Sequence, residues 1–153
     1  MVSMVDITLK NEVYREATAE GIIRLRKETI RRIIEGRVEK GDVFIISKIA
    51  AINAVKKTSE LIPLCHNIPI THVNVEFKIL DEEHVLCRVT VKTTAKTGVE
   101  MEAITGVSVA LLNVWDLVKK YEKDEKGQYP MTRIEGIRVI SKIKKGLSEA
   151  PSD

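Results

Sequence analysis

Two short segments, residues 73–79 and 85–91, carry hydrophobic side chains at every second position, with mostly polar side chains between them. This period of two is typical of a strand with one buried face. The run Asp81-Glu82-Glu83-His84 between the segments is polar and short enough to form a turn. The pattern therefore predicts a β-hairpin.

Two other segments repeat with the period of a helix. A stripe of large apolar residues predicts that the longest helix runs from about Met101 to Tyr121. Residues 43–55 begin with an apolar run that also suits a buried strand, but their later spacing and alanines favour a helix, with Asp42 as its N-cap. Pro63 and Pro69 exclude a regular helix between them.

The remaining segments complete an α+β pattern. Alternation predicts a short strand over residues 4–10, and residues 12–16 read as a loop that carries Arg15. An isoleucine stripe predicts a helix over residues 19–35, which Gly36 ends. A charged loop over 123–130 precedes a last strand over about 134–143. This order predicts an antiparallel sheet with helices packed on one face.

Composition indicates one globular domain over residues 1–153, with disordered ends at 1–3 and 147–153. Hydrophobic residues make up 44% and charged residues 31% of the chain. We find neither a signal peptide nor an apolar run near the length of a membrane span. Two scattered cysteines suit a reducing compartment, so we expect a cytoplasmic protein.

Charge and motif content limit the ligand classes. The net charge of +3 is too small to demand nucleic acid but suits an anionic small molecule. Aromatic residues make up only 4%, which argues against a base-stacking surface. No phosphate-binding glycine motif occurs, and the histidines and cysteines lack metal-ligand spacing. We therefore expect no cofactor and no metal.

The long predicted helix carries charges that a core helix rarely has. Glu100 and Glu102 stand at its start, and Asp116 and Lys119 stand near its end, three residues apart. Asp116 and Lys119 form either an ordinary surface ion pair or part of a catalytic site. Glu102 and Asp116 lie about 21 Å apart along the axis. Either the two serve different purposes, or two subunits pack so that opposite helix ends meet.

Two further positions allow both a structural and a functional reading. Cys65 and His66 lie between two prolines, either as a buried thiol and a satisfied imidazole or as a rigid grip on a polar ligand. Lys40 precedes Gly41-Asp42 at a helix start. It is either a solvated loop residue or a charge that serves a phosphate site.

Together these segments resemble the MoaC family of cyclic pyranopterin monophosphate synthases, from about residue 5 to residue 143. The motifs that carry the resemblance are Leu61-Ile62-Pro63-Leu64-Cys65-His66, Lys96-Thr97-Gly98-Val99-Glu100-Met101-Glu102-Ala103 and Asp116-Leu117-Val118-Lys119. The resemblance implies a ferredoxin-like subunit in a homohexamer, a trimer of dimers with active sites at subunit interfaces. It implies conversion of 3′,8-cyclo-7,8-dihydro-GTP to cyclic pyranopterin monophosphate, with release of pyrophosphate, in molybdenum cofactor biosynthesis.

The resemblance also implies roles for individual residues. Asp116, Lys119 and Lys40 match the family's catalytic residues. The residues that match its substrate-contacting positions are Leu64, Cys65, His66, Met101, Glu102 and Arg15. Triphosphate recognition and proton transfer both suit this set of acids and bases.

Two other functions remain open from the residues alone. The first is a non-catalytic module that binds RNA or a nucleotide with the basic side of the helix predicted over 19–35. It predicts exposed aromatic residues on the sheet. The second is a structural oligomer in which Glu102 and Asp116 form interface ion pairs.

Overall fold

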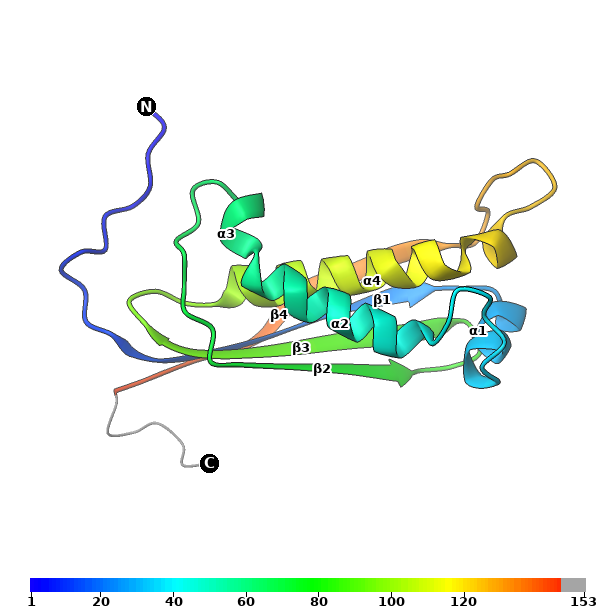
Figure 1. Ribbon diagram of the computed structural model, residues 1–153, viewed down its shortest axis with the longest axis horizontal. Helices are drawn as coiled ribbons and strands as arrows, with labels where there is room; N and C mark the ends of the chain where they lie inside the picture. Colours follow the sequence, from blue (N-terminus) through cyan, green and yellow to red (C-terminus); the bar gives the residue numbers. More distant parts are fainter. Residues whose placement is uncertain (147–153) are drawn as a thin grey trace.

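The computed structural model describes residues 1–146 (Figure 1). In chain order its elements are β1 (Val13–Arg24), α1 (Lys27–Ile34), α2 (Val43–Lys56), α3 (Thr58–Leu61), β2 (His72–Ile79), β3 (His84–Ala95), α4 (Glu100–Glu122) and β4 (Arg133–Lys145). The strands form one antiparallel sheet in the order β2-β3-β1-β4. Helices α2 and α4 lie side by side on one face of it (Figure 1). This is the predicted ferredoxin-like α+β arrangement.

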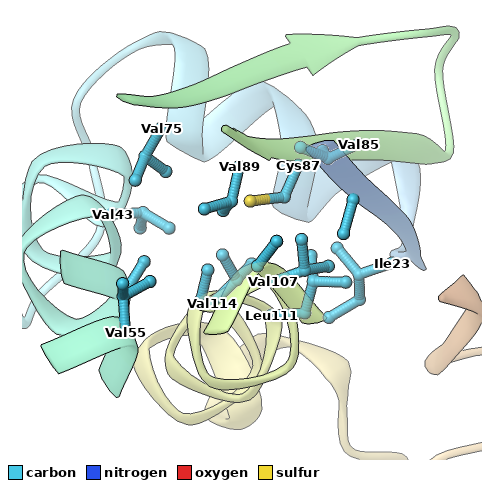
Figure 2. Packing of buried hydrophobic residues seen from close by; sticks show 14 of the residues in the cluster. Ile23, Val43, Val55, Val75, Val85, Cys87, Val89, Val107, Leu111 and Val114 are labelled. Atoms are coloured by element: carbon cyan, nitrogen blue, oxygen red, sulfur yellow. The ribbon is translucent and has the colours of Figure 1, made fainter. Parts of the chain in front are cut away.

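The hydrophobic core fills the space between the sheet and the two long helices (Figure 2). Helix α4 runs along the middle of the sheet, so its apolar stripe meets the inward side chains of β1 and β3 on one side and α2 on another. Burying each large aliphatic side chain contributes about 1.5–3 kcal/mol. The fully buried members include Ile23, Val55, Val85, Val89, Val107, Leu111 and Val114.

Two glycines allow α4 to approach its neighbours closely. A Cβ atom at Gly106 would lie 2.8 Å from Val55 Cγ2 of α2, and one at Gly21 would lie 2.9 Å from Val107 Cγ1 of α4. Real Cβ contacts are essentially never so short. Small residues at these positions therefore set the distance between α4 and both β1 and α2.

The first third of the chain differs from the sequence prediction. Residues 4–10 form no strand, and the predicted loop at 12–16 and the first part of the helix predicted over 19–35 are instead the single strand β1. The inward positions of β1 are Ala17, Ala19, Gly21 and Ile23. Because three of these residues are small, the sequence shows little alternation between hydrophobic and polar positions here. The isoleucines at 22, 23 and 30 have the spacing of a helical stripe, which favoured the wrong prediction. Only α1 remains of that helix.

The other predicted elements are confirmed with small boundary shifts. The hairpin, α2, α4 and β4 lie where the pattern indicates, and the side chain of Asp42 caps α2 by accepting a hydrogen bond from Ile45 N at 3.0 Å. Gly36 follows the C-cap of α1 with φ of 67°, as a helix-ending glycine does. The single-turn helix α3 was not predicted. The tail at 147–153 lies outside the described residues.

Helix α4 is also apolar enough to cross a membrane by length and composition, with a mean hydropathy of 1.4 over its most apolar stretch. We did not expect any run of that kind. Over half of the stretch is buried inside the protein, where it packs on the sheet. Its hydropathy thus reflects its place in the core.

Candidate active site

One cluster of charges lies at the C-terminal end of α4. Lys119 Nζ is 2.9 Å from Asp116 Oδ1, on the same face of the helix one turn later. Lys40 Nζ donates to Asp116 Oδ2 and to the Asp116 main-chain oxygen, both at 3.1 Å. The structure therefore brings together the three residues that the family resemblance assigns to catalysis.

Each member of this cluster is open to solvent. The side chains of Lys40 and Lys119 are each 45% exposed, and that of Asp116 is 57% exposed. The pKa of Asp116 is lowered from its usual value, first by the hydrogen bond from Lys119 and then by that from Lys40. The pKa of Lys119 is raised because it donates to Asp116. A carboxylate thus holds two cations at one open surface, where they can meet an anionic ligand.

The turn before α2 places Lys40. Gly41 adopts φ of 127°, a conformation that L side chains rarely adopt, and its N–H bonds to Val38 O at 3.1 Å. Asp42 then begins α2. Because α2 starts beside the end of α4, Lys40 reaches Asp116 across 76 positions of sequence.

A second cluster lies at the opposite end of α4. The side chain of Glu102 is buried, and its Oε2 accepts a weak hydrogen bond from Cys65 Sγ at 3.9 Å. Burial is the largest cause that raises the pKa of Glu102, and burial likewise raises the pKa of Cys65. Glu102 Oε1 is buried without a partner inside the chain. A buried acid with an unused oxygen is suited to receive a donor from a ligand or from another subunit.

The remaining predicted substrate residues lie near this end of α4. His66 Nε2 is 2.7 Å from the carbonyl oxygen of Val5, so the imidazole holds the N-terminal segment. The side chains of Leu64 and Met101 are exposed. Neither fills the core, which leaves both available for contact with another molecule.

Arg15 lies beside a small cavity of about 120 Å³. Its guanidinium donates to Lys96 O at 3.2 Å, while Arg15 Nε is buried without a partner in the chain. Lys142 and Lys144 from β4 also line this cavity, and Lys144 stands opposite Arg15 in the sheet. We assigned no role to these lysines from the sequence, and the strand register now places them beside Arg15.

Helix α4 separates the two clusters. It is continuous over 23 residues. The 14 steps from Glu102 to Asp116 therefore span about 21 Å. The structure joins Lys40, Asp116 and Lys119 at one end and Cys65 with Glu102 at the other, and it does not bring the two groups together within one chain. Among residues 1–146 no group of three or more His, Cys, Asp or Glu side chains is placed to hold a metal ion.

Comparisons with known proteins identify the family of this chain. The MoaC family model matches residues 4–146, which include both clusters. The chain belongs to the MoaC family. One relative from Sulfurisphaera tokodaii is 61% identical over 141 residues, which cover 92% of this chain and 93% of the relative. It carries the name probable cyclic pyranopterin monophosphate synthase.

Other relatives of this MoaC chain have similar names. A protein of Pyrococcus abyssi with the same name is 57% identical, over 94% of this chain and 89% of its own length. A protein of Methanothermobacter thermautotrophicus is 59% identical over the same shares and is named probable cyclic pyranopterin monophosphate synthase accessory protein. Identity at this level along nearly the whole chain supports carrying the family fold to every described element.

Proposed function

We propose that this protein is a cyclic pyranopterin monophosphate synthase. It is a lyase that converts 3′,8-cyclo-7,8-dihydro-GTP to cyclic pyranopterin monophosphate and pyrophosphate, in molybdenum cofactor biosynthesis, and it acts in the cytoplasm. The observation that carries the proposal is the cluster of Lys40, Asp116 and Lys119 in a chain that matches the MoaC family over residues 4–146.

The cluster supplies acid–base groups for this reaction. Forming the cyclic phosphate and rearranging the purine ring both require protons to move. Lys40 and Lys119 are the candidate proton donors and acceptors, and Asp116 orients both by direct contact. The same ammonium groups offset negative charge that develops on the phosphates.

The opposite end of α4 is the candidate binding half. Arg15 is the candidate contact for the triphosphate, since it lines a cavity together with two lysines and its Nε has no partner within the chain. The candidate contacts for the rest of the substrate are Leu64, Cys65, His66, Met101 and Glu102. Glu102 has a spare buried oxygen that can accept a hydrogen bond from the substrate's ring system.

A complete site then needs two subunits. The two halves lie about 21 Å apart on one helix, farther than one substrate-sized site extends. We propose a homo-oligomer, a hexamer built as a trimer of dimers, in which the α4 start of one subunit meets the α4 end of another. Ile45 and Ile49 of α2 and Leu112 of α4 support it, because each is more than half exposed on the helical layer.

The RNA-binding alternative has less support. It predicts exposed aromatic residues on the sheet, but the only Phe, Tyr or Trp residues in the four described strands are Tyr14 and Phe77. Tyr14 is buried, and Phe77 stacks on Phe44 of α2 with 4.7 Å between ring centroids. No strand therefore offers a stacking platform for bases.

The direct test supplies the purified protein with 3′,8-cyclo-7,8-dihydro-GTP. We expect stoichiometric release of pyrophosphate and formation of the pyranopterin product. Absence of both products from folded, assembled protein would disprove the proposed activity.

A further inference from the structure

The last turns of α4 contact Glu39 and Lys40, in the short segment between α1 and α2. The backbone N–H of Glu39 donates to the hydroxyl oxygen of Tyr121 at 3.0 Å. The next residue is Lys40, whose Nζ reaches Asp116 on the same helix. Lys120 of α4 also pairs with the Glu39 carboxylate. Three residues of α4, namely Asp116, Lys120 and Tyr121, therefore contact Glu39 or Lys40.

These contacts differ in how firmly they hold the segment. The Lys120–Glu39 pair is exposed on both sides and contributes little to the fold. Tyr121 is half-buried against the core, and the guanidinium of Arg32 lies 4.5 Å from its ring centroid. The ring is thus held by contacts from α1 and from the core. Its hydroxyl therefore offers a fixed acceptor to the backbone N–H of Glu39, the residue next to Lys40.

Contacts on either side of Glu39 and Lys40 also restrain this segment, since Val38 is buried in the core, the Gly41 N–H donates to Val38 O at 3.1 Å, and Asp42 caps α2. It lies between α1 and α2, and it includes Gly41 at φ of 127°. A long, flexible lysine side chain anchored on such a turn gains precision only if the backbone beneath it is held. We propose that Tyr121 is a positioning residue, which holds the Glu39–Lys40 backbone so that the Lys40 ammonium stays on Asp116.

This inference rests on the proposed function, because it concerns the placement of a candidate catalytic lysine. It goes beyond that function, because Tyr121 does not touch the cluster itself. The hydroxyl acts only through the main chain of its neighbour. Removing the hydroxyl while keeping the ring should therefore loosen Lys40 and leave packing intact.

The experiment compares Tyr121→Phe with Tyr129→Phe. Tyr129 lies in the loop between α4 and β4, packs its ring against Trp115 and lies close enough to Lys119 to interact with its charge. Its variant therefore removes a hydroxyl near the same cluster without removing a contact to Glu39. Two readouts are independent of turnover. Hydrogen exchange reports protection of the Glu39 amide, and limiting acetic anhydride reports the reactivity of Lys40 relative to Lys48, by mass spectrometry.

We expect Tyr121→Phe to raise exchange at Glu39 and to change Lys40 acetylation at least about two-fold, while Tyr129→Phe changes neither. We also expect kcat to fall about 5- to 20-fold with KM within about two-fold, because a displaced acid–base group lowers the chemical step rather than binding. The melting temperature should stay within about 3 °C of the parent.

The outcomes separate the two claims. Unchanged Glu39 exchange and Lys40 reactivity in folded Tyr121→Phe would overturn the positioning role, and so would loosened Lys40 with a wild-type kcat. If both turnover-independent readouts change but the unmodified protein has no turnover, the proposed function fails while the hold on Lys40 stands. If Tyr121→Phe raises KM and leaves kcat unchanged, Tyr121 serves substrate binding and the inference is wrong.

Discussion

Asp116 holds two ammonium groups that would repel each other without it. Lys119 comes from the next turn of the same helix, and Lys40 comes from the turn before α2. We expect Asp116→Asn to lower kcat/KM at least about 100-fold, because both lysines lose their orienting partner. The fold should not change, since Asp116 is more than half exposed.

Pyrophosphate release and thermal melting measure the two effects of Asp116→Asn. Glu82→Gln is the matched control, because Glu82 is also an exposed acid that pairs with a lysine, Lys27. Comparable loss of turnover in both variants would contradict a specific role for Asp116.

The pKa of Asp116 should also depend on its two lysine partners. Its pKa lies below the usual 3.8, so the carboxylate keeps its charge as pH falls through the range where an ordinary Asp protonates. Lys119 is the larger cause and Lys40 the smaller. Lys119→Met should raise the titration midpoint of Asp116, and Lys40→Met should raise it less. Carboxyl ¹³C NMR measures both midpoints, and an unchanged midpoint in Lys119→Met would show that the pair does not persist in solution.

At this scale the sequence predicts only local partners. Asp116 and Lys119 are three residues apart on a helix, so their contact follows from spacing. Lys40 joins them from 76 positions away, which only the packing of α2 against α4 explains. From the residues alone, Lys40 had no partner. The resemblance to the family supplied its role.

A buried carboxylate joins three elements at the end of α4. Glu122 is fully buried, and its oxygens accept from the backbone N–H of Arg26 at 3.2 and 3.1 Å. They also accept from the hydroxyls of Thr29 and Thr132. Helix α1 has no capping side chain of its own. Glu122 therefore caps α1 from across the fold and ties it to the start of β4.

We expect Glu122→Gln to lower the free energy of unfolding by about 2–3 kcal/mol, because the amide group offers one acceptor oxygen where three donors converge. Urea denaturation measures the loss. Glu125→Gln, in the exposed loop that follows α4, is the control and should be neutral. If the two variants unfold at the same urea concentration, the cap contributes nothing.

At Gly106 the packing predicts a change in stability opposite to the one that helix propensity predicts. Replacing a helix-interior glycine by alanine in solvent stabilises by about 1 kcal/mol. Here the new Cβ would lie 2.8 Å from Val55 Cγ2 and 3.2 Å from Val89 Cγ1. We expect Gly106→Ala to lose about 1–3 kcal/mol by denaturant unfolding, and Ser108→Ala on the same helix to change stability by under about 0.5 kcal/mol. A stabilised Gly106→Ala would show that α4 can move away from α2 and β3 at little cost.

The same close packing explains what the sequence could predict for each element. Large residues mark the inward faces of β3 and α4, and both elements were predicted. The inward face of β1 carries Ala17, Ala19 and Gly21, because α4 lies so close to it. Tertiary packing thus removed the hydrophobic signal that a strand normally gives. The prediction of a helix there was wrong for that reason.

For the whole molecule, shared sites can be tested by mixing inactive variants. Arg15→Ala damages the candidate binding half, and Asp116→Asn damages the candidate acid–base half. Random co-assembly of the two in equal amounts leaves about one quarter of sites with both halves intact if each site draws on two subunits. Sites contained in one chain would all stay defective. Pyrophosphate release after co-refolding measures the difference, and no recovery from mixed assemblies would contradict shared sites.

From the sequence, sites shared between subunits were one of two explanations for the distance between Glu102 and Asp116. Helix geometry separates Glu102 from Asp116, and the described chain keeps them apart. Neither the sequence nor one folded chain supplies the contact that would join them. The contact depends on the surface that a subunit presents, on which large apolar side chains of α2 and α4 are exposed.

The length of α4 has a genetic consequence if sites are shared. One rigid helix then contributes to two different sites, one at each end. A copy damaged at both ends that enters the assembly disables two sites at once, so an equal mixture with intact copies keeps about one quarter of its sites rather than half. In a cell that expresses both alleles, such a variant would behave as a partial dominant, even though it folds and assembles normally.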